Sequence, residues 1–229
     1  MKIYGVDEAA CTGAVKRASP MLRSAKVVCQ TGEYVCLVRD VSEDGVLLSY
    51  LHEVPGEPRI ILSLANGQTY PIQRLWAGEA QAGYRFAGHA PLEEFLHESA
   101  PFNVRPVRLT VSAAARVIDG SASYGAQLLD LSAQGAKFEI NTTLRAKNDA
   151  GALPKGRIIS FQAHGLAPLL GEIVWCEANG ASARYGVRFR SPLTLRGLAE
   201  AALRMQPLGQ GAPISPGQPI DAASAASAA

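Results

Sequence analysis

Two short segments of the sequence place an aspartate, a serine and a glycine at the same spacing, D-x-S-x-x-G. The second of them holds Asp130, Ser132 and Gly135. A carboxylate accepts hydrogen bonds from N–H donors, a hydroxyl donates and accepts, and a glycine lets the backbone approach another group closely. These residue types can therefore form a small polar binding corner. They can also serve only as a turn, because aspartate and serine bond to nearby backbone and glycine supplies a positive φ.

The first segment holds Asp40, Ser42 and Gly45, about 90 residues earlier in the chain. Two later landmarks recur in the same order: QRLW at 73–76 is matched by EIVW at 172–175, and GYRF at 83–86 by GVRF at 186–189. Self-similarity of this kind is the signature of a repeated structural unit. The sequence therefore predicts two copies of one module in tandem.

Each copy has the pattern of short strands joined by turns. Residues 25–40 are two alternating runs around Thr31-Gly32-Glu33, and Asn66-Gly67 between two β-prone runs is a strong hairpin signal. A proline followed by leucines at helical spacing then ends each copy, in 91–96 and in 192–205. The predicted fold is mainly β, with two tandem six-stranded antiparallel modules, each a small β-barrel or sandwich closed by a short C-terminal helix.

The expected boundaries are 15–98 for the first barrel and 104–205 for the second. Residues 206–229 are mostly Gly, Pro, Ala and Ser with few large apolar side chains, so a disordered tail is expected there. Trp76 and Trp175 stand at equivalent positions and are expected in the barrel cores, where large aromatic side chains are usually found.

Composition excludes several classes of function. A net charge of +2 without basic runs argues against nucleic acid as a partner. The four cysteines contain no CxxC pair, no apolar run approaches the roughly 18 residues of a membrane span, and no secretory signal is expected at the start. The four histidines lack a partner pattern, and no nucleophile or phosphate-loop motif occurs. We expect a cytoplasmic protein that is not an enzyme, with no catalytic residues, metal site or cofactor.

The repeated D-x-S-x-x-G, the V-W strand end of the second copy and the final G-V-R-F strand resemble the PilZ domain, a six-stranded barrel that binds the bacterial second messenger cyclic di-GMP. The resemblance covers roughly 15–98 and again 104–204. It implies a ligand held by the D-x-S-x-x-G corner and by an arginine arm of pattern RxxxR before the first strand. The carboxylate accepts from guanine N1 and N2, and guanidinium groups fork onto phosphate or onto the O6 and N7 edge of guanine.

The arms of this chain depart from the RxxxR pattern. In the second copy Arg108 takes the place of the second arginine and Arg105 stands one place out of register, so the arm reads RxxR. The first copy offers Arg17 and Arg23 as arm residues of a second ligand site. Loss of one of the arginine side chains that would bind the ligand costs on the order of 1.5 to 3 kcal/mol of binding free energy, or tenfold to over a hundredfold in affinity.

Two hypotheses follow from the resemblance. In the first, the chain is a cyclic di-GMP receptor that changes conformation on binding and signals to a partner protein in motility, adhesion or exopolysaccharide control. In the second, degenerate arms mark barrels that bind a protein partner and no nucleotide. The predicted ligand residues are Arg105, Arg108, Asp130, Ser132 and Gly135, with Arg17, Arg23, Asp40, Ser42 and Gly45 as the possible second site.

Overall fold

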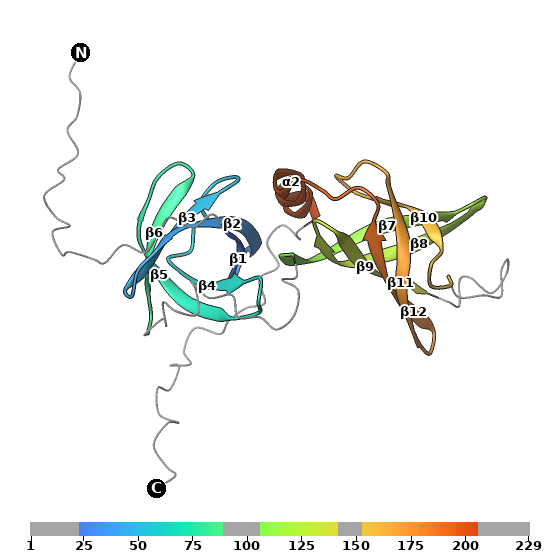
Figure 1. Cartoon of the computed structure of the whole chain (residues 1–229), viewed down its shortest axis with the longest axis horizontal. Helices are drawn as coiled ribbons and strands as arrows, with labels where there is room; N and C mark the ends of the chain where they lie inside the picture. The colour runs from blue at the N-terminus through green and yellow to red at the C-terminus, as the bar shows by residue number, and fades with distance from the viewer. Residues whose placement is uncertain (1–22, 89–105, 142–152, 206–229) are drawn as a thin grey trace, which may run out of the picture.

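The computed structural model describes residues 23–88, 106–141 and 153–205, and its strands form two closed antiparallel barrels (Figure 1). The first barrel consists of β1 (Arg23–Cys29), β2 (Gly32–Val41), β3 (Gly45–Tyr50), β4 (Arg59–Leu64), β5 (Thr69–Ala77) and β6 (Gln81–Phe86). The second consists of β7 (Arg108–Asp119), β8 (Ala122–Ser132), β9 (Gly135–Asn141), β10 (Ile158–Ala163), β11 (Leu169–Asn179) and β12 (Ser182–Phe189).

The two barrels have the same topology. The strand order is β1-β2-β3-β6-β5-β4 in the first and β10-β11-β12-β9-β8-β7 in the second, which is the same order read in reverse. The predicted pair of six-stranded antiparallel barrels is therefore confirmed.

Glycines at positive φ make the tight hairpins. Gly67 follows Asn66 in the β4–β5 turn with a φ of 90°, and Gly120 has a φ of 58° between β7 and β8. Glycine adopts this region of φ without steric penalty. The Asn66 carboxamide oxygen also accepts from the Gln68 amide at 3.0 Å, so the turn follows from the Asn-Gly pair as predicted.

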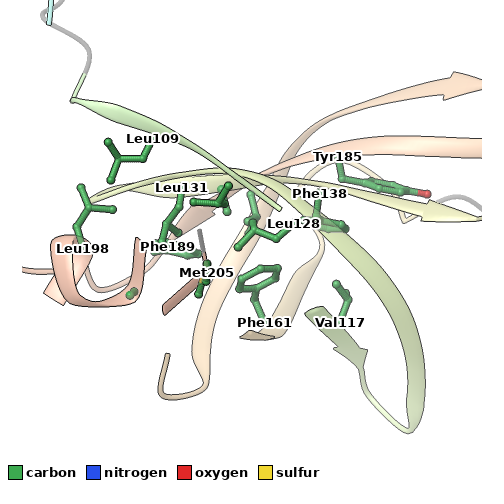
Figure 2. Packing of buried hydrophobic residues seen from close by; sticks show 14 of the residues in the cluster. Leu109, Val117, Leu128, Leu131, Phe138, Phe161, Tyr185, Phe189, Leu198 and Met205 are labelled. Carbon is green, nitrogen blue, oxygen red and sulfur yellow. The ribbon is translucent and has the colours of Figure 1, made fainter. Parts of the chain in front are cut away.

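Alternation along the strands gives each barrel its own core. In β4, Ile60 and Leu62 are buried while Ile61 between them is exposed, which is the period of two expected for a strand with one buried face. In the second barrel Phe138 and Tyr185 stack at 5.3 Å between ring centroids, and Phe161 lies 5.7 Å from Phe138 (Figure 2). Aromatic side chains thus fill the interior of the second barrel.

The helix α2 (Leu195–Met205) follows β12 and closes the second core. Its first turn is capped by Thr194, whose hydroxyl accepts from the Gly197 amide at 3.0 Å, so the helix starts three residues after the predicted proline. Leu198 and Met205 are buried with the core of the second barrel (Figure 2). The helix predicted over 91–96 and the tail predicted from residue 206 lie outside the described residues.

The described segments contain no helix with the length and apolar character needed to cross a bilayer.

The helix α2 lies between the two barrels (Figure 1). Val35, on β2 of the first barrel, is buried in the same cluster as Leu198 of α2. A polar contact accompanies this packing, because the Thr110 amide at the start of β7 donates to Glu33 Oε2 at 2.7 Å. The barrels are therefore joined by an apolar contact and by hydrogen bonds.

Candidate functional site

The Asp-Ser-Gly corner of the second barrel lies where β8 ends and β9 begins. Ser132 is completely buried, and its hydroxyl donates to the Gly135 carbonyl at 3.0 Å. The two residues are also direct cross-strand partners. In this structure the serine therefore closes the turn between the strands.

Gly135 is needed here for a reason other than a positive φ. Neither Gly135 nor its counterpart Gly45 adopts one, so the expectation that this glycine supplies a positive φ is wrong. A Cβ on Gly135 would lie 2.2 Å from the Val187 carbonyl oxygen, and a Cβ on Gly45 would lie 2.3 Å from that of Tyr84. The glycine lets two backbone strands pass closer than a side chain would permit.

A β-bulge places Asp130 on the outer face of the barrel. Leu128 pairs with Phe138, but the next pair is Asp130 with Lys137, so β8 has one residue more than β9 at this point. Without the bulge Asp130 would follow the fully buried Leu128 onto the inner face, because side chains two residues apart in a strand point the same way. The bulge thus turns the carboxylate outward.

Two cations contact the Asp130 carboxylate. Arg108 Nη1 lies 2.6 Å from Oδ1, and Lys137 Nζ lies 3.5 Å from Oδ2. The Arg108 side chain is half exposed, whereas only 13% of the Asp130 side chain is exposed. Arg108 comes from β7, where it pairs with Ser132, and Lys137 comes from β9. Strands on either side of β8 therefore bring positive charge to one acid.

The equivalent corner of the first barrel has the same turn with different surroundings. The Gly45 amide donates to the Ser42 hydroxyl at 3.1 Å, and Asp40 Oδ1 accepts from the Val41 amide at 2.9 Å. The cross-strand partner of Asp40 is Leu47, where the second barrel has Lys137. Asp40 therefore has an apolar cross-strand partner, whereas Asp130 has a lysine at the equivalent position.

The arginines predicted for the two arms do not stand at equivalent positions in the two barrels. Arg23 pairs with Val38, two residues before Asp40, whereas Arg108 pairs with Ser132, two residues after Asp130. The register therefore does not bring Arg23 to the place that Arg108 holds in the second barrel. Arg17 and Arg105 lie outside the described residues.

The prediction that both tryptophans lie in the cores is wrong. Trp76 is 51% exposed and Trp175 is 38% exposed. A bulge between Arg74 and Trp76, and another between Ile173 and Trp175, turns each indole outward. Lys137 was missed because its closeness to Asp130 depends on cross-strand register, which the spacing of the motif does not contain.

Comparison with known proteins connects this geometry to a family. Residues 103–204, which contain the second barrel and all of α2 except Met205, match the model of the PilZ domain. No curated protein matches the chain.

Several solved structures are similar to the chain at low identity. Borreliella burgdorferi PlzA in complex with c-di-GMP is 13% identical, with 80% of this chain and 88% of that chain covered and a TM-score of 0.32. The Bacillus subtilis inhibitor of motility MotI/DgrA is 7% identical, with 81% and 97% covered and a TM-score of 0.36. Escherichia coli YcgR in complex with c-di-GMP is 11% identical, with 77% and 80% covered and a TM-score of 0.31.

All three TM-scores lie below 0.5, so the family assignment depends on the domain match and not on these structures. That match covers the corner formed by Arg108, Asp130, Ser132 and Gly135. Residues 103–204 therefore carry a PilZ domain, the family that the D-x-S-x-x-G motif resembles.

Proposed function

We propose that the second barrel binds cyclic di-GMP at the Asp130 corner and that the chain is a receptor, not an enzyme. The observation that carries the proposal is the contact of Arg108 with Asp130, at 2.6 Å on the outer surface. The two residues are 22 positions apart in the sequence. The fold thus brings together the arginine and the acid to which the PilZ resemblance assigns this ligand.

The contact suggests how a ligand would be received. Without ligand, Arg108 and Asp130 satisfy one another, and a pair with an exposed partner is worth only about 1 kcal/mol or less. Separating them would free a guanidinium for a phosphate or for guanine O6 and N7, and a carboxylate for guanine N1 and N2. Ser132 and Gly135 would act indirectly, because they hold the turn that presents Asp130.

For the first barrel we propose a different role, as a module that contacts a protein and binds no nucleotide. Asp40 already accepts a backbone hydrogen bond, and Leu47 stands where the second barrel has a lysine. An anionic ligand would find less positive charge at this corner. The two hypotheses drawn from the resemblance therefore apply to different barrels.

The output of the receptor would pass to a partner protein. Ligand binding would engage Arg108, whose main-chain carbonyl accepts a hydrogen bond from Lys26 of the first barrel, and would change how the barrels pack. The PilZ resemblance implies motility, adhesion or exopolysaccharide control as the process. The cytoplasmic location expected from the sequence belongs to the same proposal.

Calorimetry with the full chain and cyclic di-GMP tests the proposal. We expect saturable binding to the wild type and loss of at least about tenfold in affinity in Arg108→Ala and in Asp130→Ala. Asp40→Ala is the matched control in the first barrel and should bind like the wild type. Absence of binding up to high micromolar ligand would overturn the proposal, and an equal loss in Asp40→Ala would overturn its assignment to the second barrel.

A further inference from the structure

A row of cross-strand partners leads away from the Asp130 corner. Asp130 on β8 pairs with Lys137 on β9, Lys137 pairs with Gly186 on β12, and Gly186 pairs with Trp175 on β11. Neighbouring strands lie about 4.8 Å apart, so the row spans roughly 14 Å from the acid to the indole. Direct cross-strand partners lie on the same face of a sheet, so this row is a single surface feature.

Both ends of the row are turned outward by bulges. Ile173 is completely buried, and an unbroken strand would place Trp175, two residues later, on the same inner face. The register shift between Ile173 and Trp175 reverses this, as the shift between Leu128 and Asp130 does at the other end. Bulges that re-aim side chains are over-represented next to binding and active sites.

The indole of Trp175 lies over a glycine that leaves room for it. A Cβ on Gly186 would be 2.0 Å from the indole Nε1 and 2.4 Å from Cε2. The ring is thus held against the backbone of β12 while more than a third of the residue stays exposed. An aromatic ring that is held in place and open to solvent can stack on a nucleotide base, a contact worth about 1–3 kcal/mol per base by alanine substitution.

Lys137 is the cation between the acid and the indole. Its Nζ lies 3.5 Å from Asp130 Oδ2, a longer contact than the 2.6 Å between Arg108 and Oδ1. The lysine side chain is also 36% exposed. A lysine is a mobile point charge and suits a phosphate oxygen, whereas arginine suits a planar, two-pronged partner.

We propose that the ligand surface of the second barrel extends along this row, with Lys137 binding a phosphate oxygen and Trp175 stacking on a purine base. The proposal rests on the function proposed above and adds two ligand residues outside the D-x-S-x-x-G motif. A cyclic dinucleotide has two purine bases joined by two phosphates. The row offers, in sequence, a carboxylate for base N–H groups, a cation for phosphate and an aromatic ring for a base.

The first barrel supplies an internal comparison. Its equivalent row consists of Asp40, Leu47, Gly83 and Trp76, and a Cβ on Gly83 would lie 2.2 Å from the Trp76 indole. Both barrels therefore have a tryptophan packed against a glycine of the neighbouring strand. The two rows differ at the position next to the aspartate, which is Lys137 in the second barrel and Leu47 in the first. Trp76 thus serves as the matched control, with the same packing in a row that has no lysine.

The test measures cyclic di-GMP affinity by calorimetry on full-length variants. Lys137→Met and Trp175→Ala are each expected to weaken binding by about tenfold. Trp175→Phe keeps a smaller ring and should lose less, and Trp76→Ala should bind like the wild type. If Lys137→Met and Trp175→Ala also bind like the wild type, the row is not part of the site, although the proposed function stands.

Fluorescence gives a second readout that a purely structural role would not change. In Trp76→Phe the only indole is Trp175, and we expect saturable quenching on titration with cyclic di-GMP because a base would stack on the ring. In Trp175→Phe the remaining Trp76 should not respond. Binding by calorimetry without a response from Trp175 would overturn the stacking role. No binding by the wild type would overturn the proposed function, and this extension with it.

Discussion

Lys26 of the first barrel donates a hydrogen bond from Nζ to the main-chain carbonyl of Arg108, at 2.9 Å. The same ammonium group forms an ion pair with Glu33 at 2.8 Å, and Glu33 accepts from the Thr110 amide at 2.7 Å. The strand that presents Arg108 to Asp130 is therefore held on its other side by two charged residues of the first barrel.

We expect Glu33→Ala to loosen this contact and to lower the free energy of unfolding by about 1–3 kcal/mol, because the Thr110 amide loses its acceptor and Lys26 loses its ion-pair partner. Glu172→Ala is the matched control, since it removes an exposed pair with Arg188 and should cost no more than about 1 kcal/mol. Urea unfolding followed by tryptophan fluorescence measures both. Equal losses in the two variants would contradict the role given to Glu33.

Arg108→Lys tests whether the shape of the guanidinium matters as well as its charge. Lysine keeps the charge but loses the planar fork, so we expect an affinity for cyclic di-GMP lower by at least about tenfold, with little change in stability. Arg157→Lys is the control, because Arg157 forms an ion pair with Asp119, at the opposite end of β7 from Arg108. Unchanged binding in Arg108→Lys would mean that a point charge is sufficient.

Gly135→Ala tests the close approach of the strands at the corner. The new Cβ would meet the Val187 carbonyl, which belongs to the backbone and cannot rotate away, so we expect a loss of about 1–3 kcal/mol in the free energy of unfolding. Gly125→Ala, also in β8, is the matched control because its Cβ would meet no atom within 4 Å. A Gly135→Ala protein as stable as Gly125→Ala would show that the strands can separate at no cost.

Alkaline pH is expected to weaken the first barrel. Burial raises the pKa of Cys29 to about 11 and raises the pKa values of Cys36, Tyr50 and Tyr84, and the hydrogen bond between the Tyr50 and Tyr84 hydroxyls raises that of Tyr50 further. The unfolded chain releases these protons earlier, near pH 9 for a thiol and pH 10 for a phenol. The stabilisation is therefore complete below about pH 9 and falls as the pH rises toward 11 and above.

The measurement is urea unfolding of Trp175→Phe at pH 8 and pH 10.5, with Trp76 as the reporter of the first barrel. We expect a lower midpoint at pH 10.5. Replacing Tyr50 and Tyr84 together by phenylalanine should reduce the difference, because it removes two of the four groups whose pKa is raised by burial. The same midpoint at both pH values would contradict the prediction.

Much of the fold was predictable because it depends on local patterns that occur twice. Asn66-Gly67 gave the correct hairpin, and the repeated motif gave two barrels with the same strand order. The motif also placed Asp130 at a strand end beside Ser132 and Gly135. These features depend on residues that are close together in the sequence, so a single sequence was sufficient to predict them.

The errors have a common cause in the bulges and the register. Trp76 and Trp175 were expected inside because large aromatic side chains are usually found in cores, and a single extra residue in the strand turned each of them outward. Lys137 and Arg23 are placed by cross-strand pairing, which depends on where the bulges lie. No spacing within one segment of sequence encodes that pairing.

The position of α2 affects the order in which the chain can fold during synthesis. All six strands of the first barrel come before the second barrel, and domains near the N-terminus generally fold first as the ribosome releases the chain. The second core obtains Leu198 and Met205 from α2, which follows its last strand, and Val35 from the first barrel. The second core is therefore complete only after α2 has been made, and one of its buried side chains comes from the first barrel. A nascent chain released before α2 would expose apolar surface on the barrel that carries the candidate site.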